Sequence, residues 1–175
     1  MTDYDFTFKV LLIGESSVKN ELSNILVPDT INSAPRLILN FDFYFKTVNY
    51  NGKKIKIIIW DRKAADRFNI LLSQVLKGSN GVVIVFKILN SEFMNNLTEW
   101  CKIIRKKAGS IPIILVRLKS ERDDSQRTPR EEIISLVKNY ITNYFEILTT
   151  EQNVTEHLIQ EIARIILQYQ AKKEI

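Results

Sequence analysis

The residues with the clearest chemical potential follow an apolar segment near the N-terminus. Gly14 comes directly after the apolar run 8–13, and Lys19 and Asn20 stand five and six residues beyond it. A strand followed by a glycine, a short polar stretch and a helix is the layout of a phosphate-binding loop, where backbone N–H groups and a lysine hold phosphate oxygens. The pattern predicts either such a loop or a tight strand-to-helix connection without a ligand.

The segment departs from the full loop pattern G-x-x-x-x-G-K-[S/T], and two registers are open. Without a gap, Lys19 stands at the second glycine, while Asn20 and Glu21 stand at the lysine and hydroxyl positions. With one residue deleted, Lys19 keeps the lysine position and Asn20 takes the metal-binding position. We favour the deletion because it places Leu22, Leu26 and Val27 at apolar positions of the following helix.

Apolar periodicity predicts strands and helices along the rest of the chain. The predicted strands cover residues 8–13, 41–50, 54–60, 81–86, 111–116 and 144–148. The predicted helices cover residues 20–27, 67–77, 91–108, 128–141 and 154–169. Asn51 and Gly52 between the second and third strands are typical of a tight hairpin, because both turn positions need a positive φ. Those two strands are therefore expected to be antiparallel.

The order of the elements predicts the fold class. Strands that alternate with helices and read as continuous apolar runs are typical of a mostly parallel sheet covered on both faces. We expect an α/β fold with a six-stranded, mostly parallel sheet, one antiparallel hairpin and helices on both faces. The composition, 45% hydrophobic and 26% charged over 175 residues, is that of a globular protein. Residues 1–175 are expected to form a single domain.

Composition also argues against several classes of site and partner. The net charge is +5, but the Lys and Arg residues are scattered, which argues against direct nucleic-acid binding. Cys101 is the only cysteine, so it cannot belong to a disulfide framework, and we expect it in the core, with His157 at the surface. We expect a cytoplasmic chain without a membrane anchor, because no secretory signal, spanning segment or prenylation cysteine is visible.

The chain resembles the Ras superfamily of small GTPases, and most of all its Rab branch. The matching segments, in order, are "FKVLLIGESSVKN", "FDFYFKTVNYNGKKIKIIIWDRKAADRF", "GVVIVF", "NLTEWCKIIRKKAGSIPIILV" and "YFEILTTEQNVTEHLIQEIA". The resemblance covers nearly the whole chain and implies the small-GTPase fold, which is P-loop NTPase-like. It also implies GTP or GDP with magnesium as ligands, and a role in vesicle trafficking.

Several positions depart from the nucleotide-contacting residues of that family. They are Ile38 at the switch threonine, Ala64 and Ala65 at the glycine and glutamine of D-x-A-G-Q, Leu118 at the asparagine of N-K-x-D, and Thr149 in the last loop. The loss of a matched hydrogen bond in a polar site can reduce discrimination on the order of a thousandfold or more. The departures therefore predict a pseudo-GTPase that is not an enzyme, with no or very weak GTP binding, no hydrolysis, and neither catalytic nor metal-binding residues.

The resemblance also places an aromatic protein-binding surface at Phe43, Trp60 and Val75, where Val75 replaces the family's tyrosine. A surface that no γ-phosphate controls suits a constitutive subunit. We therefore expect a scaffold or adaptor that binds protein partners, within a larger complex. The alternative for Phe43 and Trp60 is that they only cover the edge of the sheet.

A second hypothesis keeps the nucleotide. In it the chain is a Rab-like protein that holds GTP or GDP without turnover, with magnesium as the accompanying ion. The residues that would contact the nucleotide are Gly14, Lys19, Asn20, Asp61 and Lys119. Nucleic-acid binding and a new enzymatic activity rank below both hypotheses.

Overall fold

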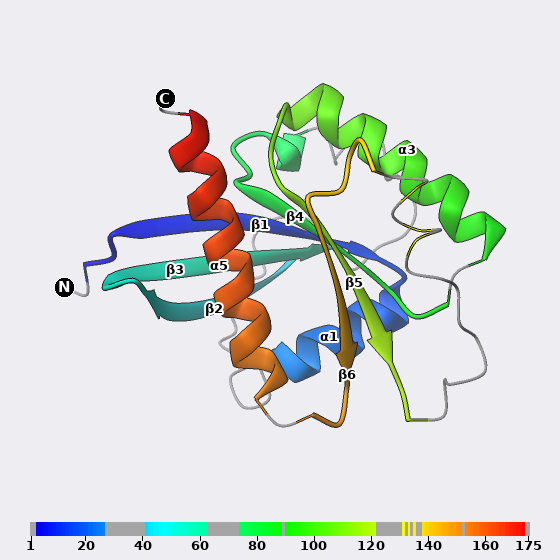
Figure 1. The fold of residues 1–175 in the computed structure, drawn as a ribbon, viewed down its shortest axis with the longest axis horizontal. Helices are drawn as coiled ribbons and strands as arrows, with labels where there is room; N and C mark the ends of the chain where they lie inside the picture. The colour runs from blue at the N-terminus through cyan, green and yellow to red at the C-terminus, as the bar shows by residue number, and fades with distance from the viewer. Residues whose placement is uncertain are drawn as a thin grey trace.

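One six-stranded sheet with helices on both faces forms the framework of the molecule (Figure 1). The structure, a computed structural model, describes residues 3–26, 41–62, 74–88, 90–121, 138–151 and 153–173, together with residues 131, 133 and 135. In chain order, the elements are β1 (Phe6–Gly14), α1 (Ser16–Leu26), β2 (Phe41–Tyr50), β3 (Lys53–Arg62), β4 (Gly81–Phe86), α3 (Ser91–Ala108), β5 (Ile113–Lys119), β6 (Asn143–Leu148) and α5 (Val154–Lys173).

The strands follow the order β2-β3-β1-β4-β5-β6. β2 and β3 are antiparallel, and every other neighbouring pair is parallel. The prediction of a mostly parallel sheet with one antiparallel hairpin is confirmed. The parallel strands β3, β1, β4, β5 and β6 all end at the same edge of the sheet, which is where ligands bind in open α/β sheets.

The turn between β2 and β3 has the predicted geometry. Asn51 and Gly52 have φ values of 50° and 74°. Positive φ at both central positions gives the turn the twist that flanking antiparallel strands require. The turn thereby fixes the register of the hairpin, in which Phe43 lies opposite Trp60.

α1 and α5 cover one face of the sheet. α1 buries Val18, Leu22 and Leu26, which lie three to four residues apart and therefore share one side of the helix. They pack with the α5 stripe Leu158, Ile159, Ile162, Ala163, Ile165 and Ile166, and with inward side chains of β1, β3, β4 and β5. Each fully buried leucine or isoleucine stabilises the fold by roughly 1.5–3 kcal/mol. This packing fixes the start of α1 above the ends of β1 and β3.

α3 covers the other face. Leu97, Cys101 and Ile104 are its fully buried residues, and they pack with side chains of β4 and β5. Burial raises the pKa of the Cys101 thiol to about 11, which keeps it protonated and unreactive. Cys101 is thus a core residue, as expected, and His157 is exposed on α5.

The structure corrects the predicted start of the first helix. α1 begins at Ser16 rather than at residue 20, so the polar residues before Lys19 are already helical. The helices predicted at 67–77 and 128–141 lie largely outside the described residues, within which 74–76, 131, 133 and 135 are helical. In the described parts of the chain, no helix combines the length and the apolar character needed to cross a membrane.

Candidate functional site

The last residue of β1 lies very close to β4. A Cβ atom on Gly14 would lie 2.4 Å from the carbonyl oxygen of Val85, and the φ of Gly14 is +151°. A side chain at this position would therefore force the two strands apart. One residue, Glu15, separates β1 from α1, and its carbonyl accepts the backbone N–H of Lys19 at 2.9 Å. The segment is a tight strand-to-helix connection.

A buried ion pair joins α1 to β3 at this edge of the sheet. Lys19 Nζ lies 2.7 Å from Asp61 Oδ1, and the two residues are only 6% and 1% exposed. Asp61 lies opposite Asp42 in the register of the hairpin. Like charges opposite each other destabilise a sheet, so the Lys19 ammonium offsets that repulsion. Asn20 is exposed, and the arrangement corresponds to the register with one residue deleted.

Lys19 and Asp61 are suitable residue types for a nucleotide with magnesium. By resemblance, the lysine would contact phosphate oxygens, and the aspartate would hold the ion through water. In this structure each is the partner of the other at hydrogen-bond distance. These residues fit phosphate and magnesium only after the pair has opened, which requires two charges to separate where little water reaches them.

A second ion pair connects α1 to the end of β4. Lys87 Nζ lies 2.7 Å from Glu21 Oε2, and both side chains are about one-third exposed, at 35% and 33%. Glu21 therefore does not point at the Lys19–Asp61 pair but at a cation that follows β4. Solvent weakens this pair relative to the buried one.

The opposite end of the candidate site lies where the small GTPases that this chain resembles bind the guanine base. Its contacts differ from those of the phosphate end. Leu118 is fully buried in the core under α1 and α5, so it has neither the chemistry nor the orientation to contact a base. Glu121 accepts a hydrogen bond from Thr150 Oγ1 at 3.2 Å, and Thr149 N–H donates to the Lys119 carbonyl at 3.2 Å. The residues at this end do not fit guanine recognition.

A network around Glu146 occupies the ends of β5 and β6. Its carboxylate lies 3.3 Å from Lys119 Nζ and 3.6 Å from an Arg117 nitrogen, and accepts the Tyr144 hydroxyl at 2.8 Å. Burial and the hydrogen bond to Glu146 raise the pKa of Tyr144. Burial alone would raise the pKa of Glu146, but the Tyr144 hydrogen bond and the Lys119 and Arg117 cations together lower it. Lys119 thus contacts a carboxylate of its own chain.

Phe43, Trp60 and Val75, the predicted partner-binding residues, lie together. The Phe43 and Trp60 rings meet edge to face with centroids 4.6 Å apart, and all three residues are half-buried against the cluster under α3. The structure brings these residues into one surface that combines β2, β3 and the segment before β4.

Lys9 connects the members of this surface, and sequence reasoning missed it. Its Nζ donates to the Val75 carbonyl at 2.6 Å and to the Lys77 carbonyl at 3.2 Å, and lies 4.2 Å from the centre of the Trp60 ring. Burial lowers the pKa of Lys9. A lysine inside the apolar run 8–13 was the available signal, because a charged residue in a buried strand needs polar partners.

A pocket opens beside Gly14 on the α3 side of the sheet. Its described lining includes the rings of Phe86, Phe93 and Trp100 and the carboxylates of Glu15 and Glu92, but no lysine or arginine. Two carboxylates disfavour a bound phosphate. The cation suited to phosphate, Lys19, lies instead on the α1 side.

Three positions that support the predicted loss of nucleotide chemistry lie outside the described residues. They are Ile38, Ala64 and Ala65.

Comparison with known proteins identifies the family. A model of the Ras family matches residues 9–168. The chain belongs to the Ras family. This Rab-like chain is 34% identical to "Ras-related protein RABE1e" of Arabidopsis thaliana, over 95% of the chain and 78% of the relative. It is 28% identical to "Ras-related protein Rab-13" of Canis lupus familiaris, over 94% of the chain and 82% of that relative.

Family membership corrects one expectation from the sequence. The chain was expected not to be an enzyme, because its nucleotide motifs depart from the family pattern. That expectation is wrong, since the relatives are Rab GTPases, which hydrolyse GTP. The substituted motif residues mark the positions at which this site departs from the family pattern. GTP hydrolysis is the activity of the family.

Proposed function

We propose that this Rab-like protein works mainly by binding protein partners, as a scaffold or adaptor within a larger complex in the cytoplasm, and that it binds guanine nucleotide weakly. Residues 1–175 act in this proposal as one domain, and vesicle trafficking is its setting. The observation that carries the proposal is the buried Lys19–Asp61 pair. It gives the phosphate-binding residues a partner within the chain.

The pair lowers nucleotide affinity because it must open before Lys19 or Asp61 can contact a ligand. Every 1.4 kcal/mol needed to open it weakens binding about tenfold. The phosphates and magnesium restore contacts to both residues after opening. Nucleotide affinity therefore depends on the free energy of the contacts with phosphate and magnesium minus that of the Lys19–Asp61 pair, rather than on the ligand contacts alone.

The base end adds little compensating affinity. Leu118 packs in the core, and Lys119 contacts Glu146. A site built to hydrogen-bond a ligand discriminates strongly because unmatched polar groups are costly, and Leu118 provides no such group. We therefore expect weak discrimination between guanine and adenine nucleotides.

The partner surface is held by contacts between protein groups. Lys9 fixes Val75 and Trp60 relative to each other, and the Phe43 ring packs against Trp60. Aromatic residues presented on a rigid sheet are favourable anchors for protein binding. This arrangement supports a surface whose shape depends on the sheet itself.

The deciding experiment measures nucleotide content and affinity in the same preparation. Purified protein is denatured, released guanine nucleotide is quantified, and melting is followed with GTP or GDP and magnesium. A ligand at about 100 times its Kd stabilises a protein by about 2.7 kcal/mol. We expect substoichiometric nucleotide and a small shift at millimolar ligand. Stoichiometric GDP in the purified protein would contradict weak binding, and GTP hydrolysis is followed in the same samples.

A second function is favoured by the position of Lys19 and Asp61 side by side at the strand ends. In it, the protein holds GTP or GDP with magnesium through Gly14, Lys19, Asn20, Asp61 and Lys119. This function predicts a large melting shift that disappears in Lys19→Ala. An unchanged melting temperature with either nucleotide would exclude it.

A further inference from the structure

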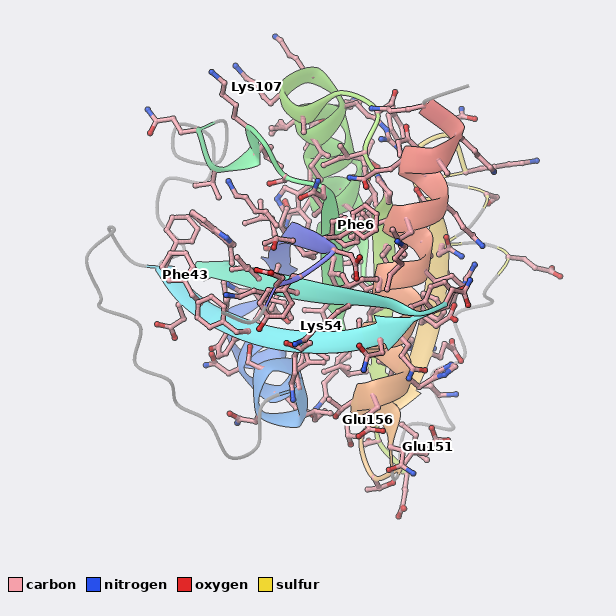
Figure 2. All side chains as sticks on the ribbon, turned by 90° about the vertical axis from the view of Figure 1, so that its left-hand side faces the viewer. Phe6, Phe43, Lys54, Lys107, Glu151 and Glu156 are labelled. Carbon is pink, nitrogen blue, oxygen red and sulfur yellow. The ribbon has the colours of Figure 1, made fainter. Side chains whose placement is uncertain are left out.

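The outer face of the β2–β3 hairpin and of β1, the face turned away from α1 and α5, has a regular composition from one end to the other. In the register of the three strands, Phe43, Trp60 and Leu11 form one row, and Phe45, Ile58 and Lys9 form the next. Thr47, Lys56 and Thr7 form the third row, followed by Asn49 and Lys54. The face is thus mainly apolar near the carboxyl ends of β1 and β3, and cationic toward the hairpin turn between β2 and β3 (Figure 2 labels Phe43 and Lys54 on the hairpin).

Among the described residues, Asp5 is the acidic neighbour of the two lysines near the turn, and its carboxylate accepts the backbone N–H of Lys54 at 2.7 Å rather than an ammonium group. Lys56 lies opposite Thr47 and beside Thr7, and Lys54 lies opposite Asn49. Opposite-charge pairs are the usual stabilising choice at such cross-strand positions. Within the described ranges, no carboxylate forms an ion pair with Lys54 or Lys56, and the nearby Asp5 pairs with Lys53 at 3.6 Å.

Aromatic rings hold these lysines against the sheet. Lys56 Nζ lies 5.0 Å from the centre of the Phe45 ring and 5.5 Å from that of Tyr4, and Lys54 Nζ lies 5.1 Å from the Tyr4 ring. Phe45 is 37% exposed, so its ring remains accessible to a partner. A ring orders an ammonium group without neutralising it. The lysines are therefore positioned in advance for a negatively charged partner.

The strand next to these residues can also pair with a partner's backbone. β2 is at one edge of the strand order, and the edge of a sheet can accept an added strand through its unpaired N–H and C=O groups. Thr47 and Asn49 are exposed and short, so they leave a path from that edge to Lys56 and Lys54. Backbone pairing favours a peptide over a nucleic acid or a lipid surface.

We infer that the outer face of the hairpin binds an extended acidic segment of a protein partner, which adds to the β2 edge and directs carboxylates toward Lys54 and Lys56 and an apolar side chain toward Phe45. This inference rests on the proposed protein-binding function and names the chemistry of the partner. Continuity with Phe43 and Trp60 lets one partner contact the whole face.

The test is a display selection of random peptides, on the order of ten residues and so long enough for one strand, against the full chain. Selected peptides are then synthesised and titrated against three proteins: the unchanged chain, Lys54→Glu/Lys56→Glu, and the control Lys106→Glu/Lys107→Glu. The control makes the same charge change at two exposed lysines of α3. Melting of each variant verifies that it is folded.

We expect the selected peptides to be rich in Asp and Glu. Their affinity should fall by about tenfold or more in Lys54→Glu/Lys56→Glu, because like charges would then face each other. The control should bind as the unchanged chain does, and added salt should weaken binding. A single-stranded oligonucleotide and phosphatidylserine vesicles are titrated in parallel.

Two results would overturn the inference. Selection of no acidic peptides, or equal affinity for the hairpin variant, would show that the lysines do not recognise a partner; neutral peptides that bind all three proteins would leave the proposed protein-binding function intact. Binding of the oligonucleotide or the vesicles that requires Lys54 and Lys56, without acidic peptides, would assign the face to that class of ligand instead.

Discussion

At the phosphate end of the candidate site, a single ion pair between Lys19 and Asp61 lies almost completely out of contact with solvent, whereas at the base end Lys119 meets Glu146 with about a third of each side chain exposed. Both are lysine–carboxylate pairs, at 2.7 and 3.3 Å, but their surroundings differ. Removing one member of a buried pair leaves a charge that water cannot stabilise, whereas an exposed charge is readily rehydrated. The phosphate end is therefore part of the core, and the base end is part of the surface.

The sharpest test of this contrast is to remove Lys19. Lys19→Met leaves Asp61 buried opposite Asp42 without the Lys19 ammonium, and we expect the free energy of unfolding to fall by about 3–5 kcal/mol. The double variant Lys19→Met/Asp61→Leu removes both charges and should recover most of that loss. Urea unfolding measures both values. A single variant as stable as the unchanged chain would show that the pair does not stabilise the fold.

Gly14 tests how tightly the phosphate end is packed. Gly14→Ala places a methyl group 2.4 Å from the Val85 carbonyl, and we expect a loss of about 1–3 kcal/mol from overpacking. Gly52 in the hairpin turn is the control, because its φ is also positive, at 74°, but a Cβ there meets nothing within 4 Å. Gly52→Ala should lose about 1–2 kcal/mol from backbone strain, without the overpacking that is added at Gly14. Equal losses at the two glycines would contradict the close approach of β1 and β4.

Much of the fold was predictable because it depends on local patterns. The apolar runs marked five parallel strands and β2, and Asn51-Gly52 marked the hairpin and its direction. The start of α1 was missed because residues 15–17 are polar and carry no helical periodicity. That start depends on contacts distant in sequence: β1 and β4 meet at Gly14, and Lys19 reaches Asp61.

The members of the candidate site were easier to predict than their partners. Lys19, Asp61 and Lys119 were singled out from motif positions, yet their contacts join residues 27 to 42 positions apart. Sequence spacing contains no information on such pairs. Lys9 and Arg117 were missed, although each is a charged residue inside an apolar strand and thus marks a place where polar partners must converge.

The base end should respond weakly to the equivalent substitution. Lys119→Gln removes one of the two cations near Glu146, and we expect a loss below about 1 kcal/mol in urea unfolding, because both groups are partly solvated. Raising the salt concentration should reduce even this difference. A loss comparable to that of Lys19→Met would remove the distinction between the two ends.

The smallest effect concerns acid. Tyr144, Lys119 and Arg117 together hold the pKa of Glu146 below its ordinary value, against the opposing effect of burial. A carboxylate with a lowered pKa in the folded state stabilises the fold above its unfolded pKa, and that stabilisation disappears as the pH falls through the folded value. Between about pH 7 and about pH 3, the unchanged chain should therefore lose slightly more stability than Glu146→Gln, which cannot titrate at this position. Glu161→Gln, at a carboxylate whose pKa Arg164 also lowers through a hydrogen bond, measures the same kind of effect outside the candidate site. If Glu146→Gln lost stability with acid as steeply as the unchanged chain, the lowered pKa of Glu146 would contribute nothing to stability, and the contrast between the base end and the buried pair would be larger.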